Sequence, residues 1–163
     1  MILRLSQKLS TKCKVTPLKV LPPDPNPFAD WSANLFTADR TQFIIVTNTP
    51  SLYSTVFYGR GIADEGQFVG RVMEALREFL AADGQEFIFR RFIAPASGTV
   101  QFSKALNRSV TGSMKDLAYH AKFWLSEGEL SPHDTSLRLN EIPFSPLKYL
   151  KPREVFKSLA VVD

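Results

Sequence analysis

Residues 65–82 carry the pattern that most constrains this chain, because only a helix places all of their apolar side chains on one face. The apolar positions recur every three or four residues, at Phe68, Val72, Met73, Leu76, Phe79 and Leu80. Charged side chains occupy the other side, and Asp83-Gly84 follows as a stop signal. An amphipathic helix of this length needs a large apolar partner, so the rest of the chain must supply one.

The predicted partner is a β-meander that precedes the helix. Residues 31–36 alternate in hydrophobicity, 43–46 form a β-branched run, and 52–58 form a third apolar segment. The intervening residues 37–41 and 48–51 have the composition of turns. Three consecutive strands joined by short turns pair most simply as an antiparallel sheet.

Further elements are expected on both sides of the meander and helix. Ser6 is placed to cap a short helix that runs to about Lys14. Pro152 is typical of the first residue of a helix, here a short C-terminal one. The patterns also predict short strands at 2–5, 86–93, 100–102 and 137–142, and a second main helix at 114–125. The fold class is therefore α+β, a mainly antiparallel sheet starting with the meander, packed by two main helices and the C-terminal helix.

Residues 16–28 form a proline-rich segment that reads as a stiff surface loop. Prolines fix φ and lack a backbone donor, so this segment cannot continue a helix or a central strand. The residues before it are too few to bury a core of their own. We therefore expect one domain over residues 1–163.

Cysteine and hydropathy bound the setting of the chain. Cys13 is the one cysteine, so an internal disulfide and a thiolate zinc site are excluded. It reads as a small buried apolar group rather than a nucleophile. No apolar run reaches the ~20 residues of a membrane span. These features predict a cytoplasmic location, with no membrane partner, no metal and no cofactor.

Charge is spread unevenly along the chain. Residues 1–19 hold five basic and no acidic side chains, and residues 84–126 hold six basic and two acidic ones. The segment between them, 20–83, holds four basic and eight acidic side chains. If the two basic blocks meet in space, they could form an anion-binding face. The alternative is an ordinary solvated surface, since the net charge of +4 is modest for a nucleic-acid binder.

The candidate site is the polar segment from 107 to 120. Ser113 and Asp116 have the spacing of a capping box, and Gly112 before them would allow a sharp turn into the helix. Alternatively, the helix start and Arg108 could bind an anion, although Asp116 already places a carboxylate at the positive end. The predicted binding residues are Asn107, Arg108, Ser109, Gly112, Ser113, Asp116 and His120.

His120 is the residue of this segment that favours chemistry. It follows Asp116 by four residues, so both would lie on one helix face, where an acid could orient the imidazole of a general base. The alternative is a residue at the boundary between core and solvent. The site therefore stays open between catalysis, binding and a simple capped helix.

Four segments of the chain together resemble a known family. They are Met1-Ile-Leu-Arg-Leu-Ser-Gln-Lys-Leu, Asp30-Trp-Ser-Ala-Asn-Leu-Phe, Asn107-Arg-Ser-Val-Thr-Gly-Ser-Met-Lys-Asp116 and Leu139-Asn-Glu-Ile-Pro-Phe144. In this order they resemble the uncharacterised bacterial domain family of unknown function numbered 6933, over nearly the whole chain. The resemblance implies one full-length domain of bacterial or phage type. It implies no activity, substrate or catalytic residue.

Three functions remain as hypotheses, in order of preference. The first is a non-enzymatic module that binds an anionic partner, with nucleic acid as a candidate, through the basic segments. The second is a protein-interaction or regulatory domain, including a homodimer. The third is a small enzyme acting on a phosphate or acyl substrate, with Arg108 binding the anion, Ser113 or Asp116 in the pocket and His120 as the base.

Overall fold

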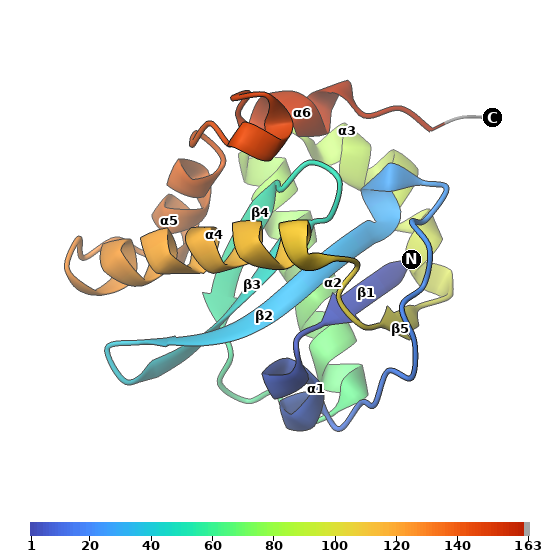
Figure 1. Ribbon diagram of the computed structural model, residues 1–163, viewed down its shortest axis with the longest axis horizontal. Helices are drawn as coiled ribbons and strands as arrows, with labels where there is room; N and C mark the ends of the chain where they lie inside the picture. Colours follow the sequence, from blue (N-terminus) through green and yellow to red (C-terminus); the bar gives the residue numbers. More distant parts are fainter. Residues whose placement is uncertain (162–163) are drawn as a thin grey trace.

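The computed structural model describes residues 1–161, which form a five-stranded sheet with helices on both faces (Figure 1). The strand order is β4-β3-β2-β1-β5. The strands are β1 (Ile2–Leu5), β2 (Asp30–Ala38), β3 (Thr41–Asn48), β4 (Ser54–Tyr58) and β5 (Gln101–Ser103). The main helices are α1 (Gln7–Cys13), α2 (Glu65–Ala82), α4 (Arg108–Ser126), α5 (Pro132–Leu139) and α6 (Pro152–Ser158). Shorter helical turns are η1 (Pro27–Ala29), α3 (Glu86–Ile88), η2 (Phe89–Ile93), η3 (Pro95–Gly98) and η4 (Ser145–Leu147).

The predicted meander is present, and the α+β class is confirmed. β2, β3 and β4 pair antiparallel, with Trp31 opposite Asn48 at one end of the first hairpin and Ala38 opposite Thr41 at the other. Both residues of the connecting turn, Asp39 and Arg40, have positive φ, at 49° and 64°. This is the geometry that matches the twist of a two-residue hairpin. β1 adds to the meander in parallel with β2, and β5 pairs in parallel with β1, so the sheet is mixed.

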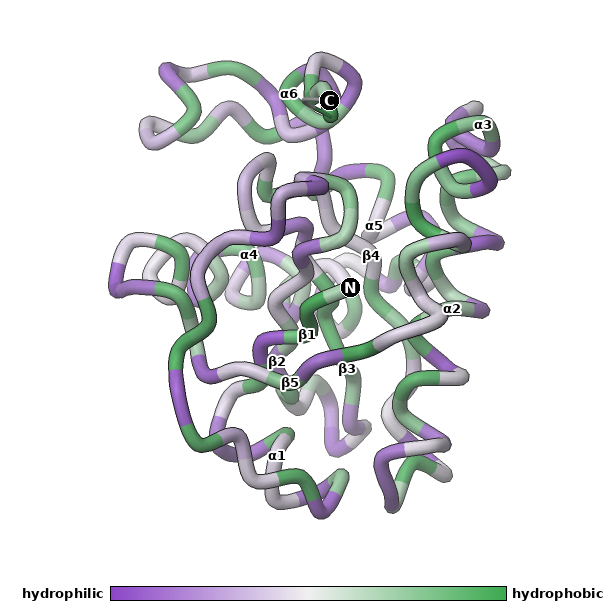
Figure 2. Tube along the Cα trace, turned by 90° about the vertical axis from the view of Figure 1, so that its right-hand side faces the viewer, coloured by the Kyte–Doolittle hydropathy of each residue, from purple (hydrophilic) through white to green (hydrophobic). Residues whose placement is uncertain are grey.

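Two apolar cores lie on opposite faces of this sheet because side chains alternate along each strand. One face presents Leu3, Trp31, Ala33, Ile44 and Val46, which pack with Phe68, Val72 and Leu76 of α2. The other presents Phe36, Phe43, Ile45 and Val56, which pack with Met114, Leu117 and Ala121 of α4. Figure 1 shows α4 in front of the sheet and α2 behind it, and Figure 2 shows the sheet between them. The expected pair of main helices therefore sandwiches the sheet.

Hydrogen-bonding groups from elsewhere in the chain lie along both edges of the sheet. At β4, the Asn140 side chain bonds both the N–H (2.8 Å) and the C=O (2.9 Å) of Ser54. The Ser136 hydroxyl accepts from the Val56 N–H at 2.8 Å. At the β5 edge, the N–H of Lys104, the residue after the strand, donates to the Lys19 carbonyl at 3.1 Å. The proline-rich loop runs beside this edge of the sheet (Figure 1).

Two predicted strands are wrong and are helical instead. Residues 86–93 form α3 and η2, in which Phe89 and Ile93 are buried one turn apart while Phe87 is 66% exposed. Residues 137–142 overlap α5, which begins at Pro132 and is capped by Ser131, whose hydroxyl accepts from the Asp134 N–H at 3.1 Å. In both segments the few apolar side chains fit a helical spacing, but the segments are too short for sequence periodicity to decide. Within residues 1–161 each helix is too short or too polar to cross a membrane.

Candidate functional site

The chain changes faces at the carboxyl ends of two neighbouring parallel strands, β1 and β5. After β1 it enters α1, whose Leu9 and Cys13 join the apolar core of the α2 face. After β5 it enters α4, which covers the opposite face. In open sheets with parallel strands, a crevice forms outside the carboxyl ends of neighbouring strands whose connections leave to opposite faces, and ligands bind there. The topology therefore nominates one place in this fold before any side chain is considered.

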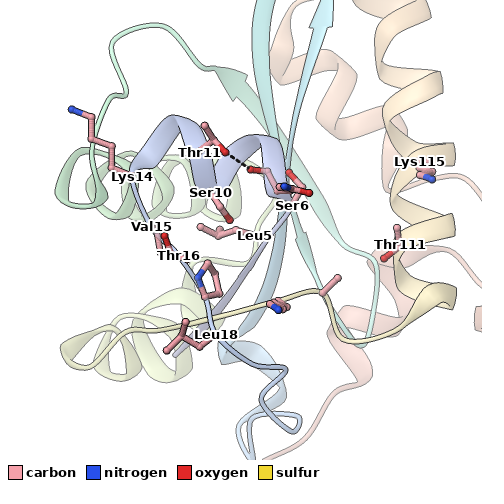
Figure 3. A pocket seen from close by; sticks show the side chains of 14 residues that line it. Leu5, Ser6, Ser10, Thr11, Lys14, Val15, Thr16, Leu18, Thr111 and Lys115 are labelled. Atoms are coloured by element: carbon pink, nitrogen blue, oxygen red, sulfur yellow. Dashed lines mark hydrogen bonds between the residues drawn. The ribbon is translucent and has the colours of Figure 1, made fainter.

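A cavity of about 1310 Å³ occupies this place (Figure 3). Its lining residues come from the end of β1, from α1 and the loop after it, from the two residues that follow β5, and from the first turns of α4. They are Leu5, Ser6, Gln7, Ser10, Thr11, Lys14, Val15, Thr16, Pro17, Leu18, Lys104, Ala105, Thr111 and Lys115. Pockets for small ligands usually measure roughly 300–1,000 Å³. This cavity is larger, which suits an extended ligand.

The charged side chains of the cavity are all basic. Lys14 comes from the first basic block of the sequence, and Lys104 and Lys115 come from the second. None of the described lining residues is acidic. Within residues 1–161, no hydrogen bond or ion pair engages the ammonium group of any of these three lysines, which are all exposed. Both basic blocks thus contribute lysines to the lining of one cavity, and Figure 3 shows the Lys14 side chain directed outward, away from Thr111 and Lys115.

The remaining lining is part hydroxyl and part apolar. The Thr11 hydroxyl donates to the Gln7 carbonyl at 3.0 Å, and the Thr111 hydroxyl donates to the Asn107 carbonyl at 3.1 Å. The protons of these two hydroxyls are therefore committed to the helix backbone, whereas the Ser10 and Thr16 hydroxyls also line the cavity and can donate to a ligand beside the lysines. Leu5 and Leu18 add apolar surface, and Leu18 is 86% exposed. An anionic ligand with some apolar surface fits this combination.

Helix α4 begins six residues earlier than the sequence suggested, so the predicted capping box is wrong. Its cap is Asn107, whose side chain accepts from the Val110 N–H at 2.9 Å. Ser113 is buried within the helix, and Gly112 is exposed in its second turn. The apolar repeat starts at Val110 and continues through Met114 and Leu117. That earlier start, together with an asparagine three residues before Val110, is the signal that sequence reasoning missed.

The other residues of the predicted site lie on the surface of α4. Arg108, Ser109 and Asp116 are exposed, and His120 is half-buried. The His120 ring stacks on Trp124 with centroids 5.6 Å apart and meets Tyr119 edge-on at 6.0 Å. Aromatic rings, rather than a carboxylate, thus hold the imidazole in the described structure.

None of the seven predicted binding residues lines the large cavity. The segment 107–120 reaches it instead through Thr111 and Lys115, which lie one helical turn apart. Figure 3 shows these two side chains across the cavity from Ser6 and Ser10. Sequence reasoning therefore chose a segment that contributes to the cavity, but the residues that it predicted are not the ones that line the cavity.

The remaining groups with possible reactivity are the Cys13 thiol and the side chains that could bind a metal ion. Cys13 is buried, and its burial raises the pKa of the thiol to about 11, so it stays protonated near neutral pH. Within the described residues, the histidine, cysteine and carboxylate side chains do not gather in threes or more around a common point that could hold a metal ion. Cys13 does not line the cavity, whose charged lining side chains are the three lysines.

Comparison with known proteins gives one match. The model of a family described as a domain of unknown function, DUF6933, matches residues 2–155. No curated protein and no solved structure matches the chain significantly. The family match spans nearly the whole sequence, including β1 through most of α6. The chain therefore belongs to the DUF6933 family of domains of unknown function.

Proposed function

We propose that this chain is a non-enzymatic module that binds an anionic partner in the cavity between α1 and α4. One observation carries the proposal: Lys14, Lys104 and Lys115 come from three separate segments and line a single cavity whose described lining contains no carboxylate. Scattered surface lysines would not be expected to converge at the carboxyl ends of β1 and β5. The convergence supports selection for an anion at that place.

The exposure of these lysines determines what kind of anion fits. All three are exposed, so each interacts with a ligand charge through water and is screened by salt. A single small anion would gain little from such contacts. A partner with several regularly spaced negative charges would engage all three and release its condensed counterions. We therefore propose a polyanion, and a bacterial cytoplasm as the setting in which it is met.

The decisive experiment compares two variants that lose the same charge. In the cavity variant, Lys14, Lys104 and Lys115 become alanine. In the control, the exposed Arg77, Arg91 and Lys157, which do not line the cavity, become alanine. Binding to heparin is measured between about 50 and 200 mM salt. The cavity variant should lose most of its affinity for heparin. The slope of log affinity against log salt concentration should become shallower by roughly 2–3, at about 0.7–0.9 for each lost contact.

Two results would overturn the proposal. If the wild-type protein does not bind heparin at about 50 mM salt, the three lysines do not form a binding site for a polyanion. Equal losses in the cavity variant and the control would mean that net charge, and not the cavity, attracts the polyanion. Circular dichroism melts of both variants should match the wild type, because the substituted side chains are exposed.

The enzymatic alternative has less support. It needs Arg108, Asp116 and His120 around one concavity, and none of them lines the large cavity. The His120 ring stacks on Trp124 and meets Tyr119 edge-on, so its contacts are with aromatic side chains and not with Asp116. The interaction alternative, by contrast, has one specific observation in its favour, the exposed aromatic side chains of α4.

A further inference from the structure

The outer face of α4 combines exposed aromatic rings with basic side chains. Tyr119 is 74% exposed and Phe123 is 56% exposed, one helical turn apart. Helical geometry, at ~100° per residue, places Arg108, Lys115 and Lys122 on the same outward half of the helix. All three are exposed. Asp116 is the one acidic residue between Arg108 and Ser126, so this face is net positive.

This face is continuous with the cavity described above. Lys115 lines the cavity, and Tyr119 follows it by one turn on the same side of α4. Phe123 follows Tyr119 by a further turn, with Lys122 beside it. A ligand that leaves the cavity past Lys115 would therefore meet, in order, a ring, a cation and a second ring.

We infer that the anionic partner is single-stranded nucleic acid, which runs from the cavity along the outer face of α4. Lys104, Lys115 and Lys122 would contact its phosphates, and Tyr119 and Phe123 would each stack on a base. This inference rests on the proposed function, because it uses the same cavity. A cationic track lined by exposed aromatic rings is the arrangement by which proteins bind single strands without reading their sequence.

The spacing of the two rings favours a single strand over a duplex. Four residues of helix advance about 6 Å. Neighbouring bases in a duplex are separated by ~3.4 Å, and their faces are already stacked on one another. Each ring can therefore receive a base only from a strand that is extended and unpaired. An acidic peptide would satisfy the lysines but would leave the faces of Tyr119 and Phe123 unused.

The experiment measures fluorescence anisotropy with labelled oligonucleotides of about 15 nucleotides, near the upper site size of one single-strand binding unit. The probes are oligo-dT, oligo-rU, a DNA duplex of the same length and poly-glutamate. We expect the single strands to bind at least about tenfold more tightly than the duplex at equal salt. The aromatic variant changes Tyr119→Ala and Phe123→Ala, and its control changes Phe87→Ala and Tyr149→Ala, two rings of the same types that are at least as exposed.

The aromatic variant should lose about tenfold or more in affinity for oligo-dT, whereas the control should bind like the wild type. Exchange of the rings, Tyr119→Phe with Phe123→Tyr, should preserve binding because both rings still stack. Heparin has no bases, so its binding should be unchanged in the aromatic variant. These readouts separate the inference from the proposed function. Heparin binding by the lysine variant tests the cavity, whereas oligo-dT binding by the aromatic variant tests stacking on the two rings.

Three outcomes overturn the inference while leaving the proposed cavity intact. Duplex or poly-glutamate binding as tight as oligo-dT binding would show that charge alone is recognised. An aromatic variant that binds oligo-dT like the wild type would show that the rings do not stack on bases. A wild-type dimer that the aromatic variant converts to a monomer in analytical ultracentrifugation would show that this face joins two copies of the chain.

Discussion

Arg4 and Asp30, on the neighbouring strands β1 and β2, form a buried ion pair with two parallel hydrogen bonds. Nε donates to Oδ1 and Nη2 donates to Oδ2, both at 2.8 Å. The Arg4 guanidinium also donates to the carbonyls of Leu21 and Pro22 in the proline-rich loop, at 2.7 and 3.2 Å. One residue thus joins two strands to the loop that runs beside the sheet edge. It also means that Arg4, counted in the first basic block, is neutralised inside the fold.

Replacing Arg4 by methionine should destabilise the chain strongly. The Asp30 carboxylate would remain buried without its cation, and two loop carbonyls would lose their donor, which together should cost about 3–5 kcal/mol. Urea unfolding followed by circular dichroism measures the change. The exposed Arg77→Met provides the control and should stay within about 0.5 kcal/mol of the wild type. A double variant with Asp30→Asn should recover part of the loss, and no recovery would contradict the ion-pair explanation.

The cap of α4 can be tested with a pair of small substitutions. The structure makes Asn107 the cap, so Asn107→Ala should cost about 1 kcal/mol in the free energy of unfolding. The sequence pattern gave that role to Ser113, which instead lies buried inside the helix. Ser113→Ala should therefore change stability by less than Asn107→Ala, because alanine favours a helix interior. The reverse order in urea unfolding would restore the predicted capping box.

The elements that sequence reasoning placed correctly are those whose local pattern is long and unambiguous. The repeat from Phe68 to Leu80 fits only a helix, whereas the alternation around Trp31 and the β-branched composition of 43–46 favour strands. Residues 86–93 were misassigned because Phe87 and Phe89 mimic a strand. The buried pair is in fact Phe89 and Ile93, which the chain selects by packing on α2. Such a choice depends on tertiary contacts that a short window does not contain.

The positive charge of the candidate site was predictable from the sequence, but its location in the fold was not. The two basic blocks were visible in the sequence, and their meeting at Lys14, Lys104 and Lys115 follows from the parallel pairing of β1 with β5. That pairing joins residues almost a hundred positions apart, and β5 is only three residues long. Without it, Lys104 reads as an ordinary loop lysine. The polar composition of 107–120 drew attention to the right helix, but its cap explains Asn107 without a ligand.

The Asn140 side chain substitutes for a neighbouring strand at the edge of β4. It accepts from the Ser54 N–H and donates to the Ser54 C=O, and both groups are buried. Asn140→Ala should cost about 1–3 kcal/mol, since the two backbone groups lose their partners. It should also expose a strand edge and so promote association, which light scattering at rising protein concentration would detect. Thr37→Ala, at an exposed position of β2, is the control, and an equal effect there would refute this role of Asn140.

Cys13 provides a prediction with a definite sign in pH. Burial raises the pKa of its thiol from 9.0 to about 11. Between these values the unfolded chain releases a proton that the folded chain keeps, so the free energy of unfolding falls as the pH rises. The loss is at most about 1.4 kcal/mol for each unit of pKa difference. Well below pH 9 both the folded and the unfolded chain keep the proton, so this loss of stability is absent.

The variant Cys13→Ala isolates this effect from the other groups that titrate in alkali. It removes a buried side chain, so at pH 8 it should be less stable than the wild type by a measurable amount. The wild type alone pays for holding the thiol proton, so the gap between the two proteins should narrow from pH 8 to pH 10.5. Urea unfolding of both proteins at both pH values gives the gap directly. A gap that stays constant would mean that the folded chain does not raise the pKa of Cys13.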